Sequence, residues 1–148
     1  MSNRFVRALA VTLACAGTAL AASACGSPTS PSSVTTSSGT YSQTDLVVGT
    51  GALAVAGSRA TVAYTGWPYD TSRPEGKGTS FDASTSFPFT IGAGQVIAGW
   101  DQGVPGMRVG GQRRLVLPPS LAYGSRSPGA GIPPNATLVF DITLLNVQ

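Results

Sequence analysis

Three long segments of the chain alternate apolar and polar side chains with a period of two. These segments are residues 59–67, 112–117 and 137–147. Such alternation is typical of a strand with one buried face. Two shorter stretches, 79–82 and 87–91, carry phenylalanine between small or β-branched residues. We therefore predict three long strands and two short ones.

A single segment is a candidate helix. Residues 95–102 lie between Gly94 and Gly103, which leaves room for a helix of about two turns. Val96, Ile97 and Trp100 are expected to fall on the same side of such a helix. One short helix among several strands predicts an α+β fold, in which an antiparallel sheet covers the helix.

The first residues are typical of a secretory signal peptide, which we predict at residues 1–24. Arg4 and Arg7 are followed by an uncharged, mostly apolar run over residues 8–22. This run is shorter than the about 20 residues of a membrane-spanning helix. The signal peptide predicts a protein that works outside the cytoplasm.

The end of this segment, Ala22-Ser23-Ala24-Cys25, is similar to a bacterial lipobox. In that case Cys25 becomes lipidated and anchors the chain to a membrane. Ordinary cleavage after Ala24 also fits the residues, and it would leave a free secreted or periplasmic protein. The only other cysteine, Cys15, lies in the predicted signal peptide, so the mature chain has no disulfide.

The composition changes sharply after the signal peptide. In residues 26–44, 16 of 19 side chains are Ser, Thr, Pro or Gly and none is charged. We interpret residues 25–44 as the lipidated cysteine and a flexible tether, and residues 45–148 as one folded domain.

Charge and histidine content exclude several kinds of site. The chain has no histidine, which excludes histidine triads and histidine metal ligands. Its nine Lys and Arg become seven once Arg4 and Arg7 are removed with the signal peptide, against six Asp and Glu. That balance does not predict nucleic-acid binding, and neither a metal nor a cofactor is expected.

Six short segments of the predicted domain form a motif when they are taken together, in this order and at this spacing. They are Tyr64-Thr65-Gly66, Phe81-Asp82, Val96-Ile97-x-Gly99-Trp100, Gly103-Val104-x-Gly106-Met107-x-Val109-Gly110, Leu121-Ala122-Tyr123-Gly124 and Ile132-Pro133-Pro134-Asn135-Ala136-Thr137-Leu138-Val139-Phe140-Asp141. Together they resemble the FK506-binding-protein family of peptidyl-prolyl cis-trans isomerases, over the whole of the predicted domain.

The resemblance implies a five- or six-stranded antiparallel sheet wrapped around one short helix, with an apolar cleft that accepts a prolyl ring. Position by position, the cleft residues it implies are Tyr64, Phe81, Asp82, Phe87, Val96, Ile97, Trp100, Tyr123, Ile132 and Phe140. Trp100 is expected as the floor. The Tyr123 hydroxyl and the Ile97 N–H are expected to bind substrate carbonyls.

Four of these residues, Asp82, Tyr123, Tyr64 and Phe140, are the catalytic candidates. Asp82 is expected to act electrostatically, either by holding Tyr123 through a hydrogen bond or by facing the carbonyl carbon of the twisted amide. Its alternative role is structural, as the cap of a surface turn. Rotation of an X-Pro bond needs no nucleophile or proton shuttle, so the missing histidine does not argue against an enzyme.

The expected substrates are proline-containing polypeptides among exported proteins, with FK506-type macrolides as ligands and a monomer as the working form. A non-catalytic module of the same fold, which binds proline-containing segments, is the alternative function.

Three departures from the family pattern bear on these expectations. The segment 83–86 is short and lacks the arginine that commonly pairs with the cleft aspartate; Arg73 or Arg126 could replace it. Gln95 stands where glutamate is more frequent. Residues 68–78 form an insertion after the first long strand.

Overall fold

The structure, a computed structural model, describes residues 40–148. The predicted signal peptide at residues 1–24, the lipidation candidate Cys25 and the tether as far as residue 39 lie outside the described residues. Within the described part, no helix is both long enough and apolar enough to cross a membrane.

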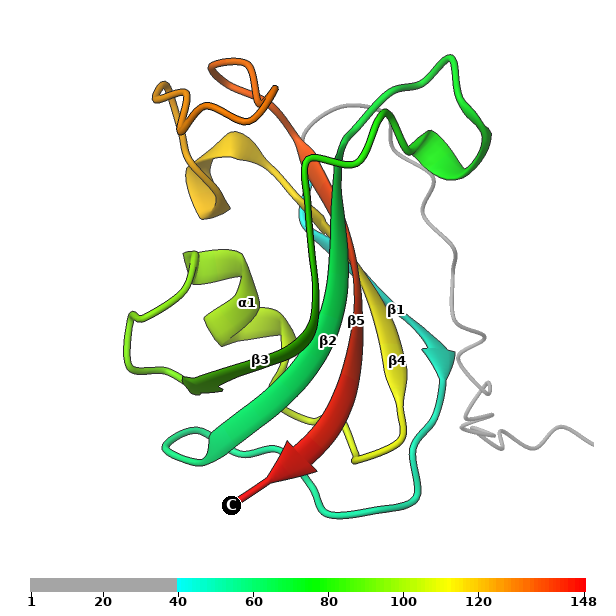
Figure 1. The fold of residues 1–148 in the computed structure, drawn as a ribbon, viewed down its shortest axis with the longest axis vertical. Coiled ribbons are helices and arrows are strands. Elements are labelled where there is room, and N and C mark those ends of the chain that lie inside the picture. Colours follow the sequence, from blue (N-terminus) through cyan, green and yellow to red (C-terminus); the bar gives the residue numbers. More distant parts are fainter. Residues whose placement is uncertain (1–39) are drawn as a thin grey trace, which may run out of the picture. The chain divides into compact units, whose positions relative to one another are not determined.

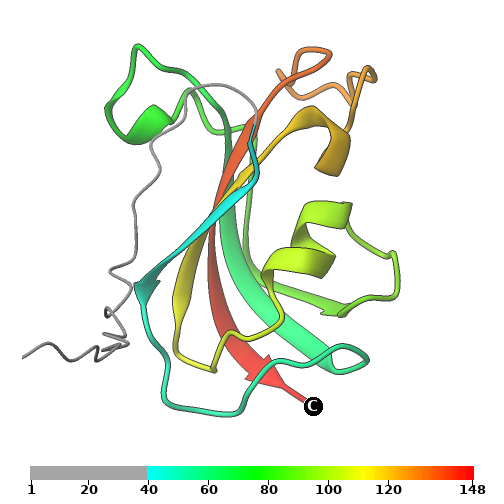
Figure 2. The ribbon, with the colours of Figure 1, turned by 180° about the vertical axis from the view of Figure 1, so that it is seen from behind.

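Five antiparallel strands form one sheet in the order β1-β4-β5-β2-β3, with one helix against it (Figure 1). The elements are β1 (Ser42–Val47), β2 (Arg59–Pro68), β3 (Asp82–Thr90), α1 (Ala98–Gly103), β4 (Gln112–Leu117) and β5 (Leu138–Val147), with 3-10 turns at Pro74–Gly76 and Pro119–Leu121. Seen from behind, α1 again lies on one side of the sheet (Figure 2). The predicted α+β class, with a five-stranded sheet around one short helix, is confirmed.

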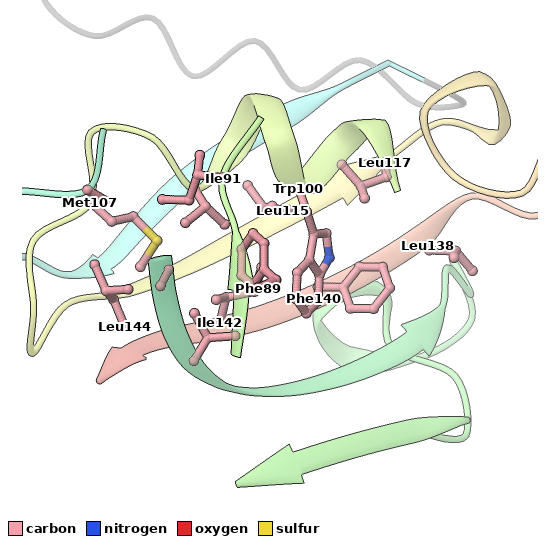
Figure 3. Close-up of a cluster of buried hydrophobic side chains, with 14 of the residues drawn as sticks. Phe89, Ile91, Trp100, Met107, Leu115, Leu117, Leu138, Phe140, Ile142 and Leu144 are labelled. Atoms are coloured by element: carbon pink, nitrogen blue, oxygen red, sulfur yellow. The ribbon is translucent and has the colours of Figure 1, made fainter. Parts of the chain in front are cut away.

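The core lies between α1 and the face of the sheet that α1 covers. Every second residue of β5 enters it: Leu138, Phe140, Ile142 and Leu144 are all at most 3% exposed. Figure 3 shows these side chains together with Trp100 of α1. The strand alternation therefore identified the buried face correctly.

The helix begins later than the pattern predicts. Residues 95–97 are not helical, and Ile97 is the N-cap, with extended backbone angles of φ −60° and ψ 146°. Gly92 and Gly94 have positive φ values of 78° and 67°, which favour glycine and let the chain turn sharply before α1. A Cβ at Gly103 would lie 2.6 Å from Leu115, so the helix packs directly against β4.

The strand predicted at residues 87–91 is confirmed over residues 87–90, whereas of the strand predicted at 79–82 only Asp82 is in a strand. Residues 82–90 form one continuous strand, β3. A register shift between Val62 and Tyr64 places residues 85 and 86 of β3 opposite one residue of β2, which is a β-bulge. The segment 83–86 consists of small residues, one Ala followed by Ser, Thr and Ser, so its sequence carries no apolar–polar alternation to reveal the strand.

The sheet also begins before the predicted start of the domain at residue 45. Residues 42–44, which we assigned to the tether, pair with Arg114, Leu115 and Val116 of β4. β1 is an edge strand, and the Ser, Gln and Thr side chains of these residues are exposed. Composition alone does not separate a polar edge strand from a tether.

Arg113 interrupts the apolar face of β4 because it ties three elements together. The residue is 6% exposed, and its guanidinium donates to the Asp45 carboxylate of β1, with Nη2 3.0 Å from Oδ2. It also donates to the carbonyl of Gly103 at the end of α1, at 2.7 Å. Hydrogen bonds thus satisfy this buried charge.

The insertion at residues 68–78 folds back onto the sheet face opposite α1. Lys77 Nζ lies 2.7 Å from Asp141 Oδ2, and Arg114 Nε lies 2.7 Å from Asp141 Oδ1. Glu75 completes the group at 3.0 Å from Arg114. Asp141 alternates with the buried Phe140 and Ile142, so this ion cluster lies outside the core.

Candidate active site

One cleft of about 440 Å3 opens beside α1, and aromatic rings form most of its wall. Its lining residues are Tyr64, Phe81, Asp82, Phe87, Gln95, Val96, Ile97, Trp100, Tyr123 and Phe140. Nine of the ten cleft residues implied by the family resemblance in the sequence analysis are in this set. Strands β2, β3 and β5, helix α1 with the turn before it, and the loop after β4 all contribute.

Trp100 lies at the centre of the aromatic contacts. Its ring is 4% exposed and meets Tyr64 edge to face, with centroids 4.8 Å apart. It meets Phe140 at 5.4 Å and Phe87 at 6.1 Å in the same manner. Such edge-to-face contacts stabilise rings in fixed orientations. Trp100 therefore lines the cleft with a ring that three other aromatic rings hold in place.

Gly66 is the residue of β2 that lets two aromatic rings of the wall approach. A Cβ at this position would lie 2.7 Å from Phe81 and 2.7 Å from Phe140. Those two rings are in edge-to-face contact at 5.7 Å. In the motif Tyr64-Thr65-Gly66, Tyr64 thus contributes its ring to the cleft. Gly66, which has no side chain, leaves the space that the rings of Phe81 and Phe140 occupy.

The carboxylate of Asp82 accepts a hydrogen bond of 2.6 Å from the hydroxyl of Tyr64. This corrects one expectation, because the hydroxyl bonded to Asp82 is that of Tyr64 and not that of Tyr123. Burial, and then the hydrogen bond and charge of Asp82, raise the pKa of Tyr64 to about 12. Tyr64 thus stays a neutral phenol through the neutral range.

Tyr123 approaches the cleft from the loop after β4 and is 37% exposed. Burial, followed by the nearby charge of Asp82, raises its pKa. Among residues 40–148, its hydroxyl makes no hydrogen bond. The hydroxyl is therefore an available donor at the cleft wall.

The turn before α1 brings Val96 and Ile97 into the cleft. The carbonyl of Ile97 accepts the N–H of Trp100 at 2.9 Å. The Ile97 N–H itself has no acceptor in the part of the chain that is described. Asp101 fixes the turn, since its carboxylate accepts the N–H groups of Gly92 at 2.8 Å and Gly94 at 3.1 Å.

Ile132 is the predicted cleft residue that does not line the cleft. It is 4% exposed and belongs to the core. Its N–H donates to Gly129, and its carbonyl accepts from Ser127 Oγ at 2.6 Å, so it secures the base of the loop. An isoleucine in a loop fits a core position as well as a cleft position, and the sequence does not separate the two.

Gln95 is the lining residue that our predicted set omitted. Its side-chain oxygen accepts the N–H of Thr90 at 2.9 Å, which links the cleft mouth to the end of β3. Its position directly before the predicted cleft residues Val96 and Ile97 was the sequence feature that could have identified it as a lining residue.

Neither proposed substitute for the missing arginine pairs with Asp82. Arg73 lies 3.7 Å from Asp70 within the insertion, so this expectation is wrong. Arg126 makes no ion pair with any of the residues 40–148. In the same range no three metal-ligating side chains cluster together.

Comparison with known proteins agrees with this geometry. Residues 51–145 match the family model for FKBP-type peptidyl-prolyl cis-trans isomerase. An FK506-binding protein of Neisseria meningitidis serogroup A is 46% identical over 107 residues, which are 70% of this chain and 92% of the relative. An FK506-binding protein of Streptomyces anulatus is 47% identical over 108 residues, which are 70% of this chain and 82% of that protein.

Solved structures show the same fold. AtFKBP13 matches with a TM-score of 0.62 and 38% identity over 73% of this chain and 93% of its own. FkpA from Escherichia coli matches with a TM-score of 0.62 and 35% identity, over 73% of this chain and 48% of its own. The chain therefore belongs to the family of FKBP-type peptidyl-prolyl cis-trans isomerases.

Proposed function

We propose that this cleft accelerates cis-trans rotation of X-Pro bonds in exported polypeptides. The observation that carries the proposal is an aromatic cleft with two donors at its rim, the Tyr123 hydroxyl and the Ile97 N–H, neither of which bonds to an acceptor within residues 40–148. A prolyl ring is apolar and brings no N–H that would need an acceptor. The carbonyls beside it do need donors, and these two groups supply them.

Rotation about the X-Pro bond has a barrier of about 18 to 20 kcal/mol because the amide loses its resonance at the midpoint. No covalent bond forms or breaks. A cleft that removes water from the amide, and that fits the twisted form better than the planar ones, lowers this barrier. The Trp100 floor and the Phe87 and Phe140 walls supply such a surface.

Asp82 has an electrostatic role in this proposal. Its carboxylate is anchored by Tyr64, so it faces the cleft in a fixed position. As the amide twists, conjugation is lost and the carbonyl carbon becomes more electron-poor. A fixed negative charge beside that carbon stabilises the twisted amide more than the planar one.

The test is catalysed exchange of a short X-Pro tetrapeptide, with and without an FK506-type ligand. We expect the exchange rate to rise with enzyme concentration, and the ligand to suppress it while changing the fluorescence of Trp100. Correctly folded protein that binds the tetrapeptide without accelerating exchange would favour the non-catalytic binding module instead.

We further propose that the chain works as a monomer outside the cytoplasm, held to a membrane by lipid on Cys25. The signal-like residues 1–24, the sequence Ala22-Ser23-Ala24-Cys25 and the lone mature cysteine support the anchor. A cleft whose walls all come from one chain supports the monomer.

Expression of the full chain in bacteria, followed by mass analysis of its first mature peptide, tests the anchor. A diacylglyceryl group on Cys25, absent from Cys25→Ala, is the expected result. An unmodified peptide that begins at Cys25 would indicate ordinary secretion. The elution volume of the detergent-solubilised protein reports its oligomeric state.

A further inference from the structure

The strand β3 lies at one edge of the sheet, with β2 on one side and no strand of the described residues on the other (Figure 1). An edge strand presents backbone N–H and C=O groups that another extended chain can pair with. Natural edges are usually protected by a charged side chain, a proline or a covering loop. The question is whether β3 carries such protection.

One end of β3 is protected and the rest is open. Pro88 has no N–H to offer, and the N–H of Thr90 is already bonded to Gln95. From residue 83 to residue 86 the side chains are Ala, Ser, Thr and Ser, without charge and largely exposed. The one side-chain bond within this stretch, from the Ser86 N–H to Ser84 Oγ, is long at 3.3 Å.

The open stretch lies directly beside the catalytic cleft. Asp82 precedes it and Phe87 follows it, and both line the cleft. A polypeptide with its prolyl ring over Trp100 therefore passes this edge within a few residues of the ring.

A second hollow, of about 610 Å3, lies on the other side of the same stretch. Ala83, Ser84 and Thr85 line it, together with Thr65 and Trp67 of β2. Successive side chains of a strand point to opposite faces of a sheet. A chain added to β3 would thus direct alternate side chains toward the cleft and toward this outer hollow.

We propose that the residues flanking the proline of a bound polypeptide add to β3 as an extended strand, along residues 82–87. This deepens the proposed isomerase function and rests on it. The partner is an extended, unfolded segment, and backbone hydrogen bonds hold it. Recognition by backbone tolerates many sequences, which suits an enzyme that acts on unfolded chains.

The first test compares substrates. The wild-type full chain is assayed on a prolyl tetrapeptide and on a decapeptide with the same X-Pro core and uncharged flanks. We expect kcat/KM for the decapeptide to be higher by roughly tenfold, because each of two or so backbone hydrogen bonds contributes a factor of a few. Equal values for the two peptides would overturn the proposal.

The second test removes single N–H groups of the decapeptide by N-methylation, one position at a time. Only alternate residues of a strand direct their N–H toward a given neighbour. N-methylation should therefore abolish the gain in kcat/KM of the decapeptide over the tetrapeptide at every second position along one side of its proline. Losses without this alternation would overturn strand addition.

The third test changes the edge itself. Thr85 belongs to the bulge and has no paired residue on β2, so Thr85→Pro removes one N–H of the open stretch without removing a β2–β3 pair. We expect this variant to lose the decapeptide gain and to keep wild-type activity on the tetrapeptide. Thr85→Ala keeps the N–H and is the matched control, which should retain the gain. A Thr85→Pro variant that folds and retains it would contradict the proposal.

If the wild type does not accelerate exchange of the tetrapeptide, the proposed isomerase function is contradicted, but strand addition to β3 is not. In that case the decapeptide is titrated into labelled protein and followed by NMR. Protection of amides in residues 83–86 from exchange supports strand addition, whereas changes confined to the cleft overturn it.

Discussion

The hydroxyl of Tyr64 on β2 donates a 2.6 Å hydrogen bond to the carboxylate of Asp82 on β3. The bond joins two walls of the cleft, and it occupies the carboxylate that arginine commonly pairs with in this family. Asp82 makes no ion pair within residues 40–148. Its negative charge is therefore positioned by a neutral partner and remains uncompensated beside the cleft.

Removing this charge should slow catalysis without unfolding the protein. We expect Asp82→Ala to lower kcat/KM for a prolyl tetrapeptide by roughly tenfold, the equivalent of one hydrogen bond to a charged group. The free energy of unfolding should change by less than about 1 kcal/mol, because Asp82 is exposed. Asp70→Ala removes an exposed aspartate of the insertion and should leave the rate unchanged. An unchanged rate in Asp82→Ala would remove Asp82 from the mechanism.

Alkaline pH should destabilise the protein through Tyr64. Its pKa is about 12 when folded and near the ordinary value of 10.0 when unfolded. Between these values the folded state keeps a proton that the unfolded state has lost, so stability falls as pH rises. Urea unfolding at a series of pH values from 9 upward measures the slope. Tyr64→Phe should show a shallower fall, and an identical fall in both proteins would contradict the assignment.

Filling the space at Gly66 should damage the cleft wall. Because a Cβ there would lie 2.7 Å from both Phe81 and Phe140, we expect Gly66→Ala to reduce the free energy of unfolding by roughly 2 kcal/mol. Activity should fall with it as the two rings move. Thr65→Ala, the neighbouring change on the other sheet face, should cost about 0.5 kcal/mol. Equal stability of Gly66→Ala and wild type would show that the rings adjust freely.

The ion cluster at the insertion should make the fold sensitive to acid. Burial by itself would raise the pKa of Asp141, but hydrogen bonds from Arg114 and Lys77 outweigh it and hold the pKa below its usual value. The stabilisation from the charged form is therefore present above the unfolded value of 3.8 and is lost as pH falls through the folded one.

Asp141→Asn should be less stable than wild type at pH 6 by about 2 kcal/mol, since it leaves two cations without their shared carboxylate. The difference should shrink as pH falls below 4, which urea unfolding at each pH measures. A difference that is constant with pH would show that the charge of Asp141 is not the cause.

The sequence by itself determined the buried faces of the long strands and most of the cleft. Leu138, Phe140, Ile142 and Leu144 occupy every second position of β5 and are all buried, and a period of two is a local property of the sequence. The cleft residues were implied by the resemblance of six segments to a known family, and nine of the ten residues it implied line one hollow. Aromatic rings and glycines of this kind are not interchangeable, and this makes the segments specific.

Only the tertiary structure decided which polar groups meet. Tyr123, Arg73 and Arg126 were the candidate partners of Asp82, but the residue that bonds to it is Tyr64, because these distances depend on strand register and loop path. The bulge at residues 85 and 86 and the polar strand over residues 42–44 were also hidden, because their side chains carry no periodic signal. The burial pattern of a strand depends on the local order of apolar and polar residues, which the sequence shows directly. A hydrogen bond between residues far apart in the sequence depends on how the strands are aligned in the folded protein.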